Sequence, residues 1–71
     1  MTNMTGQLSK ELLRLCNIYT SEDKMEKLSF KDKAQRSRLC REFAQYAGDN
    51  DITDVGQFPE KFDPIVNAEL S

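Results

Sequence analysis

The sequence predicts an all-α fold, a small helical bundle of about three helices with a looped, acidic C-terminal segment. Apolar residues recur at helical spacing through the first two thirds of the chain. No stretch alternates apolar and polar residues for long enough to indicate a strand. With 71 residues, the chain has room for one domain with a thin core, and we expect residues 1–71 to form it.

A first helix is expected over about residues 5–19, where apolar side chains follow one helical face. The residues on this face are Leu8, Leu12, Leu15, Cys16 and Tyr19, with Leu13 and Ile18 widening the stripe. This face predicts the side of the helix that packs on the rest of the bundle.

A second helical stretch is expected over residues 22–47, with a break near residue 29. Ser29 can cap a new helix, because Asp32 follows three positions later as in a capping box, and Phe30 can then turn inward. An unbroken helix is the alternative. Gly48 is expected just past the helix end, in the left-handed conformation that glycine tolerates.

The remainder of the chain is predicted to form loops and short helical turns. One turn of helix is possible over residues 52–57, and Asp63 followed by Pro64 is typical of a helix start, here over 64–70. Two aromatic residues are expected to help close the core: Phe58 and Phe62.

Charge is unevenly distributed along the chain. Residues 24–42 carry seven basic and three acidic side chains, whereas residues 43–71 carry one basic and six acidic side chains. This asymmetry predicts a basic helix that could bind an acidic protein surface or nucleic acid. The candidate partner-binding residues are Lys24, Lys27, Lys31, Arg38, Arg41 and Gln45.

An alternative explanation is that these cations pair within the molecule, for example with Asp49, Asp51 or Asp54. A further pair is expected between Asp32 and Arg36, since they lie four residues apart on the apolar side of the helix. Ion pairs of either kind would be structural.

Enzymatic chemistry has few residues available. The chain has no His, which excludes Ser-His-Asp and Cys-His catalysis. Two cysteines cannot supply the four ligands of a structural zinc site. We therefore expect no catalytic residues, no metal and no cofactor, and we interpret the chain as a non-enzyme.

Two patterns resemble known motifs but lack features that those motifs require. Ala44 and Gly48 have the spacing of a helix-turn-helix turn, but Pro59 would end the recognition helix early. The acidic run from Asp49, with Glu60 at the twelfth position, resembles a calcium loop, yet its sixth position lacks the required glycine. An acidic turn after a helix is the simpler interpretation.

Cys16 and Cys40 lie in or beside apolar stripes, so we expect buried free thiols that approach each other when the helices pack. The first residues lack the pattern of a secretory signal, and no apolar run is long enough to span a membrane. A cytoplasmic location follows as the expectation.

These observations favour a small protein-binding module that acts stoichiometrically as an adaptor, inhibitor or regulator, and that could self-associate. Small regulators of this kind occur in bacteria and their phages. A nucleic-acid-associated regulator that uses the basic helix 24–41 is the alternative. A structural subunit of a larger assembly is the third hypothesis.

Overall fold

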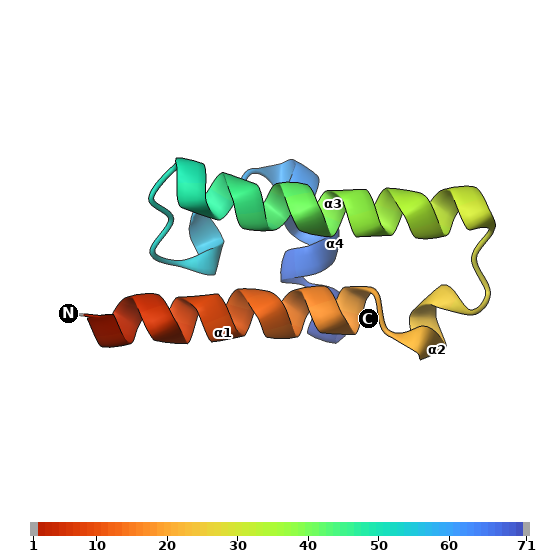
Figure 1. Cartoon of the computed structure of the whole chain (residues 1–71), viewed down its shortest axis with the longest axis horizontal. Coiled ribbons are helices and arrows are strands. Elements are labelled where there is room, and N and C mark those ends of the chain that lie inside the picture. Colours follow the sequence, from red (N-terminus) through yellow and green to blue (C-terminus); the bar gives the residue numbers. More distant parts are fainter. Residues whose placement is uncertain (1, 71) are drawn as a thin grey trace.

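The computed structural model describes residues 2–70, with side chains from Leu8 onward, and its fold is all-α as predicted. Two long helices, α1 (Thr2–Tyr19) and α3 (Phe30–Asp49), are joined through the single turn α2 (Glu22–Met25). A second single-turn helix, α4 (Asp63–Val66), lies near the C-terminus (Figure 1). Three short 3₁₀ turns complete the set: η1 (Val55–Gln57), η2 (Glu60–Phe62) and η3 (Ala68–Leu70).

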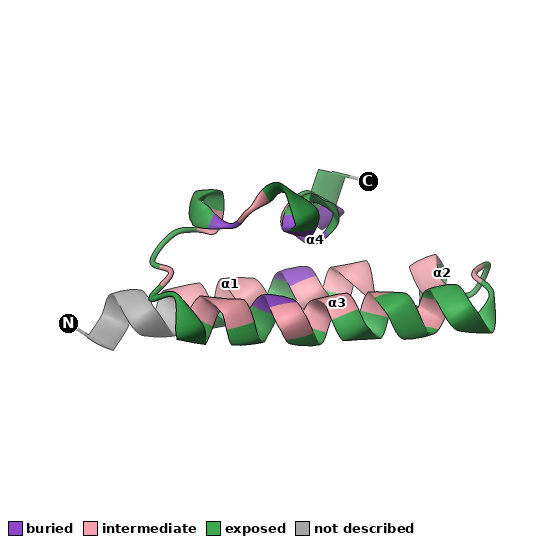
Figure 2. Ribbon diagram, turned by 90° about the horizontal axis from the view of Figure 1, so that it is seen from above, coloured by how far each residue is buried: buried purple, intermediate pink, exposed green. Residues whose placement is uncertain are grey.

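The elements form two layers. Helices α1 and α3 run antiparallel, side by side, and the C-terminal segment from η1 to η3 crosses one face of this pair (Figures 1 and 2). The Cα atoms extend 41 × 19 × 16 Å, so the molecule is elongated. One broad face of that layer is covered and the other is not.

The core lies between the two layers and is mainly aromatic. Phe43 of α3 is fully buried and stacks on Phe58, with ring centroids 4.1 Å apart. Phe62 meets the edge of Phe43 at 5.5 Å, and Tyr46 flanks both C-terminal rings. Leu15 is the buried contribution of α1. The expectation that Phe58 and Phe62 close the core is thus met in the structure.

Helix α3 begins where the capping pattern places it. The Ser29 side chain accepts a hydrogen bond from the main-chain amide of Asp32 at 3.2 Å, and residues 26–29 separate α2 from α3. Ser29 is extended, with φ −67° and ψ 162°, which is typical of a helix N-cap. At the other end of the chain, α1 starts at Thr2, earlier than the expected position near residue 5.

The expected role of Gly48 is wrong. Gly48 is inside α3, which continues to Asp49, and the left-handed residue is Asp51, with φ 52°. Aspartate tolerates this conformation better than most residues. The Asn50 side chain also donates to the carbonyl oxygen of Tyr46 at 3.1 Å, which satisfies a carbonyl near the helix end.

The continuous terminal helix predicted over 64–70 is replaced by α4 and η3, and α4 starts at Asp63 with Phe62, the last residue of η2, as its N-cap. Phe62, Ile65 and Ala68 are all buried. Their spacing of three residues matches the 3.0 residues per turn of a 3₁₀ helix, in which such side chains lie in line. Burial of this row therefore favours tight turns over a regular α-helix.

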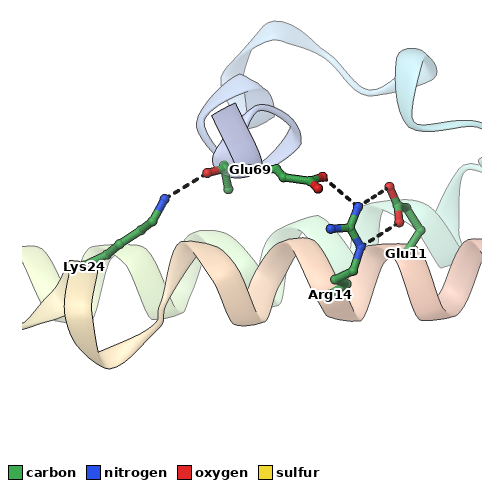
Figure 3. A network of polar contacts seen from close by, with 5 residues as sticks. Glu11, Arg14, Lys24 and Glu69 are labelled. Carbon is green, nitrogen blue, oxygen red and sulfur yellow. Dashed lines mark hydrogen bonds and ion pairs between the residues drawn. The ribbon is translucent and has the colours of Figure 1, made fainter. Parts of the chain in front are cut away.

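Polar contacts attach η3 to the helical layer (Figure 3). Arg14 of α1 pairs with Glu69 at 2.8 Å and with Glu11 at 3.0 Å. Lys24 of α2 donates from Nζ to the carbonyl oxygen of Ala68 at 2.9 Å. These contacts position the end of the C-terminal segment over α1.

Candidate functional site

One exposed face of α3 carries most of the predicted partner-binding residues. Lys31, Arg38 and Gln45 are seven residues apart, so they line up along the helix, and Arg41 lies beside them. All four are exposed, and Lys27 is exposed in the connector that leads into α3. From Lys31 to Gln45 the line is about 21 Å long, given a rise of about 1.5 Å per residue. We call Lys27, Lys31, Arg38, Arg41 and Gln45 the basic strip.

The basic strip makes no ion pair with an acid within residues 8–70. The ion pairs there join Arg14 to Glu11 and Glu69, and Lys61 to Glu42 at 3.0 Å. The pairs considered above between the strip and the acids after α3 are thus not formed in the described part of the chain. Its positive charges face solvent.

Lys24, the sixth predicted residue, is not brought together with the others. It is half-buried and its ammonium group is turned to the carbonyl of Ala68 in the C-terminal segment (Figure 3). This places it in the contact between layers, because a lysine with a short hydrogen bond to a partly buried carbonyl holds that segment in place.

The predicted inward position of Phe30 is wrong. It is 88% exposed instead of turning inward, and it immediately precedes Lys31 of the basic strip. The Ser29 cap itself contains the signal, because a helix starting at Phe30 turns that residue about 140° away from buried Phe43 at 100° per residue. An exposed aromatic ring thus lies at the start of the strip.

The expected Asp32–Arg36 ion pair is also not formed. Arg36 instead donates to the carbonyl oxygen of Tyr19 at 2.9 Å, and its guanidinium carbon lies 4.5 Å from the centre of the Tyr19 ring. Both contacts join α3 to the end of α1. For the Arg36 guanidinium, a carbonyl acceptor together with an aromatic face is a more favourable set of contacts than one exposed carboxylate.

The two cysteines are free and partly buried between α1 and α3. Burial raises the pKa of the Cys16 thiol, and burial together with the neighbouring Cys16 sulfur raises the pKa of Cys40 to about 12. A thiol with a raised pKa is mostly protonated near neutral pH and is a poor nucleophile. Both side chains therefore act as packing groups.

An apolar groove lies between α1 and the end of α3, with a volume of about 380 Å³. Ser9 is its one polar side chain among residues that are otherwise apolar or glycine. Leu13 is 62% exposed at its rim. The other lining residues are Leu8, Leu12, Cys16, Ala44, Ala47, Gly48 and Ile52. We call this feature the apolar groove.

Sequence reasoning missed the apolar groove, although Leu13 contained a signal for it. Leu13 is two positions from buried Leu15, so on a helical wheel it points about 160° away from Leu15. Ala44 and Gly48 were considered for a helix-turn-helix spacing, and Gly48 also for the helix end, but both line the groove on the side of α3.

Neither a metal cluster nor a membrane-spanning helix is found in the described residues. No three His, Cys, Asp or Glu side chains gather there closely enough to hold an ion. None of the helices over residues 2–70 combines the length and apolarity needed to cross a bilayer.

Comparison with protein-family models, with curated protein sequences and with solved structures finds no match to this chain. The two surfaces that the geometry assembles are the basic strip and the apolar groove.

Proposed function

We propose that the protein is a small non-enzymatic protein-binding module that holds an acidic partner protein on the basic strip. It would act stoichiometrically, as an adaptor, inhibitor or regulator. The main support is that the cations of the strip have no ion pair with an acid within residues 8–70. Exposed charges without an intramolecular partner are available to a partner of opposite charge.

The make-up of the strip favours a protein partner. Arg38 and Arg41 can each bind a carboxylate with two parallel hydrogen bonds, and the exposed ring of Phe30 adds apolar contact area. Aromatic residues and Arg are the types that most often dominate the binding energy of protein interfaces. An acidic helix or loop that also carries an apolar side chain would match this combination.

The surroundings of the strip disfavour nucleic acid. Asp49 is exposed one turn beyond Gln45, on the same side of α3, and Glu42 lies beside the strip. A duplex carries one negative charge per about 1.7 Å of its axis, so these carboxylates would face phosphates. Three cations on α3, with Lys27 just before it, fit a local acidic patch better than an extended phosphate backbone.

We also propose a cytoplasmic location, which the neighbouring free thiols of Cys16 and Cys40 support. Thiols in such positions persist in a reducing compartment. Self-association is compatible with this function.

The proposal is tested by charge reversal on the strip. Tagged wild-type protein and the Arg38→Glu/Arg41→Glu variant would each be incubated with lysate of the native cell, and the retained proteins identified. The double variant is expected to lose the main partner while its circular dichroism stays unchanged, because both side chains are exposed.

A matched pair of single variants controls for net charge. Arg41→Glu and Lys10→Glu change the charge equally at exposed positions on different helices. The first should weaken binding of the captured partner by about tenfold or more, and the second should leave it nearly unchanged. Equal effects of the two would show that only overall charge matters and would refute the strip as the site.

A further inference from the structure

The packing of α1 on α3 brings the two cysteines of the chain together. Cys16 and Cys40 are 24 positions apart in the sequence, and each Sγ lies against the main chain of the other residue, 3.9 and 3.8 Å from its carbonyl oxygen. The Cys16 thiol is also one of the groups that raise the pKa of Cys40. Two neighbouring thiols on facing helices are the arrangement from which an intramolecular disulfide forms.

A second contact holds the two helices in register around this pair. Arg36, one turn before Cys40, donates to the carbonyl oxygen of Tyr19 at 2.9 Å and lies over its ring. Tyr19 is three residues after Cys16, so both contacts follow the same antiparallel seam between α1 and α3 (Figure 1). Helices that are fixed against each other at adjacent turns keep the two thiols at a high effective concentration.

Both carbonyl oxygens keep a donor when the thiol hydrogens are removed. The Cys16 oxygen also accepts from the main-chain amide and the hydroxyl of Thr20, at 3.0 and 2.8 Å. Cys40 is inside α3, where the helical geometry supplies a main-chain donor from the residue four positions on. Since a thiol is only a weak donor, its replacement by a covalent bond loses little hydrogen bonding.

The apolar groove gives a small oxidant access to the pair. Cys16 is one of the residues that line the groove, whereas Cys40 is not. A small molecule in the groove therefore reaches Cys16 first, with Cys40 next to it on the facing helix.

We propose that Cys16 and Cys40 are a site of reversible oxidation, at which a low-molecular-weight disulfide converts the two thiols to an intramolecular disulfide that links α1 to α3. The Cys16 thiolate attacks one sulfur of the oxidant, whose S–S bond breaks, and the released small thiolate takes up the proton that Cys16 lost. The Cys40 thiolate then attacks Cys16 Sγ, breaks the mixed disulfide and releases a second small thiolate, which takes up the Cys40 proton. Two protein thiols are oxidised, and one small disulfide is reduced to two thiols.

The raised pKa values make this exchange slow but favour its product. Little thiolate is present near neutral pH, which limits the rate. A thiol pair that is not stabilised as thiolates gives a disulfide that is harder to reduce. The pair stays reduced where small thiols are in excess and forms the bridge when small disulfides accumulate. This inference does not depend on the partner proposed for the basic strip.

The test compares the bridge in the folded and in the unfolded chain. The whole protein would be equilibrated with reduced and oxidised glutathione, in buffer and in denaturing urea, starting from both the reduced and the oxidised protein. After acid quenching, mass spectrometry measures the fraction of chains that have lost two hydrogens, and peptide mapping locates the link. The equilibrium constant for the bridge should be about thirtyfold or more larger in buffer than in urea, because native packing holds the thiols together.

The double variant Cys16→Ser/Asn17→Cys is the matched control. It moves one thiol by a single residue to an exposed position, so the loop in the unfolded chain keeps nearly the same length. In the folded chain this thiol is turned about 100° from its original direction on α1. Its bridge should form in urea as the wild-type bridge does, and it should be no more favourable in buffer than in urea.

A wild-type ratio of the two equilibrium constants that is no larger than the ratio for the control overturns the proposal. Glutathione adducts or cross-linked dimers as the main oxidised products of the folded wild type, in place of the intramolecular bridge, also overturn it.

Discussion

Cys16 and Cys40 bind each other's main chain reciprocally: each Sγ donates to the carbonyl oxygen of the other residue, at 3.9 and 3.8 Å. This exchange joins the last turn of α1 to the middle of α3. It lies next to both the aromatic core and the apolar groove, since Cys16 packs against the first and lines the second. Two small thiols thus set how closely the two long helices approach.

The thiols should react slowly in the folded protein. Because their pKa values are raised, with that of Cys40 at about 12, little thiolate exists near pH 8. Iodoacetamide should therefore modify both cysteines much more slowly in buffer than in denaturing urea, as followed by mass spectrometry. Equal rates in the two conditions would contradict the buried position of these side chains.

The same shift predicts a loss of stability in alkaline solution. A thiol whose pKa is raised by folding stabilises the fold fully below its ordinary pKa of about 9, and this contribution is lost as pH rises toward about 12. The midpoint of urea unfolding should therefore fall over this range. In Cys40→Ala the fall should be shallower, since tyrosines and lysines titrate in both proteins and only the thiol differs.

The two phenylalanines of α3 should respond oppositely to truncation. Phe43 is fully buried, so Phe43→Ala should cost about 3–5 kcal/mol, enough to unfold most of a domain this small. Phe30 is 88% exposed, so Phe30→Ala should change the free energy of unfolding by less than about 0.5 kcal/mol. Circular dichroism during urea unfolding distinguishes them. Similar losses would place Phe30 in the core.

Gly48→Ala should stabilise the protein by about 0.5–1 kcal/mol, because alanine is the better helix former and its Cβ has free space at this position. Asp51→Ala should destabilise it, since Asp51 has φ 52°. Both changes are measured by urea unfolding. A destabilised Gly48→Ala variant would indicate that the helix ends before Gly48.

The ion pair between Arg14 and Glu69 should be visible in a titration. Hydrogen bonding and charge attraction from Arg14 hold the pKa of Glu69 below its ordinary value of 4.5. This contribution to stability is present above pH 4.5 and is lost as pH falls through the lowered pKa. In Arg14→Gln, NMR titration of the Glu69 carboxyl should give a pKa closer to 4.5. An unchanged value would mean that Arg14 does not contact it in solution.

Apolar periodicity predicted the all-α fold, and the Ser29 capping pattern predicted the break before α3, because each depends on residues close together in the chain. The wrong predictions depend on distant contacts. Arg36 contacts Tyr19 instead of the predicted partner Asp32, because α1 ends beside Arg36. The C-terminal turns follow the buried row that starts at Phe62, which local helix signals do not reveal.

Part of the candidate site could be predicted from the sequence. Lys31, Arg38 and Gln45 were identified by their spacing along one face, which a straight helix preserves. Sequence reasoning could not distinguish Lys24 from these residues, because the contact that sets Lys24 apart is with Ala68, 44 positions away in the chain. The apolar groove depends on how α1 packs on α3, and the position of Leu13 on its helix indicates only one side of it.

The salt dependence of capture tests the central claim, that the basic strip holds an acidic protein, most directly. Tagged wild-type protein would be loaded with native lysate and eluted in rising salt, with both protein and nucleic acid assayed in each fraction. Our account predicts one main protein, held partly by apolar contact at Phe30 and therefore retained beyond the salt at which nonspecific proteins elute. Nucleic acid as the main retained species, released steeply at moderate salt, would contradict it.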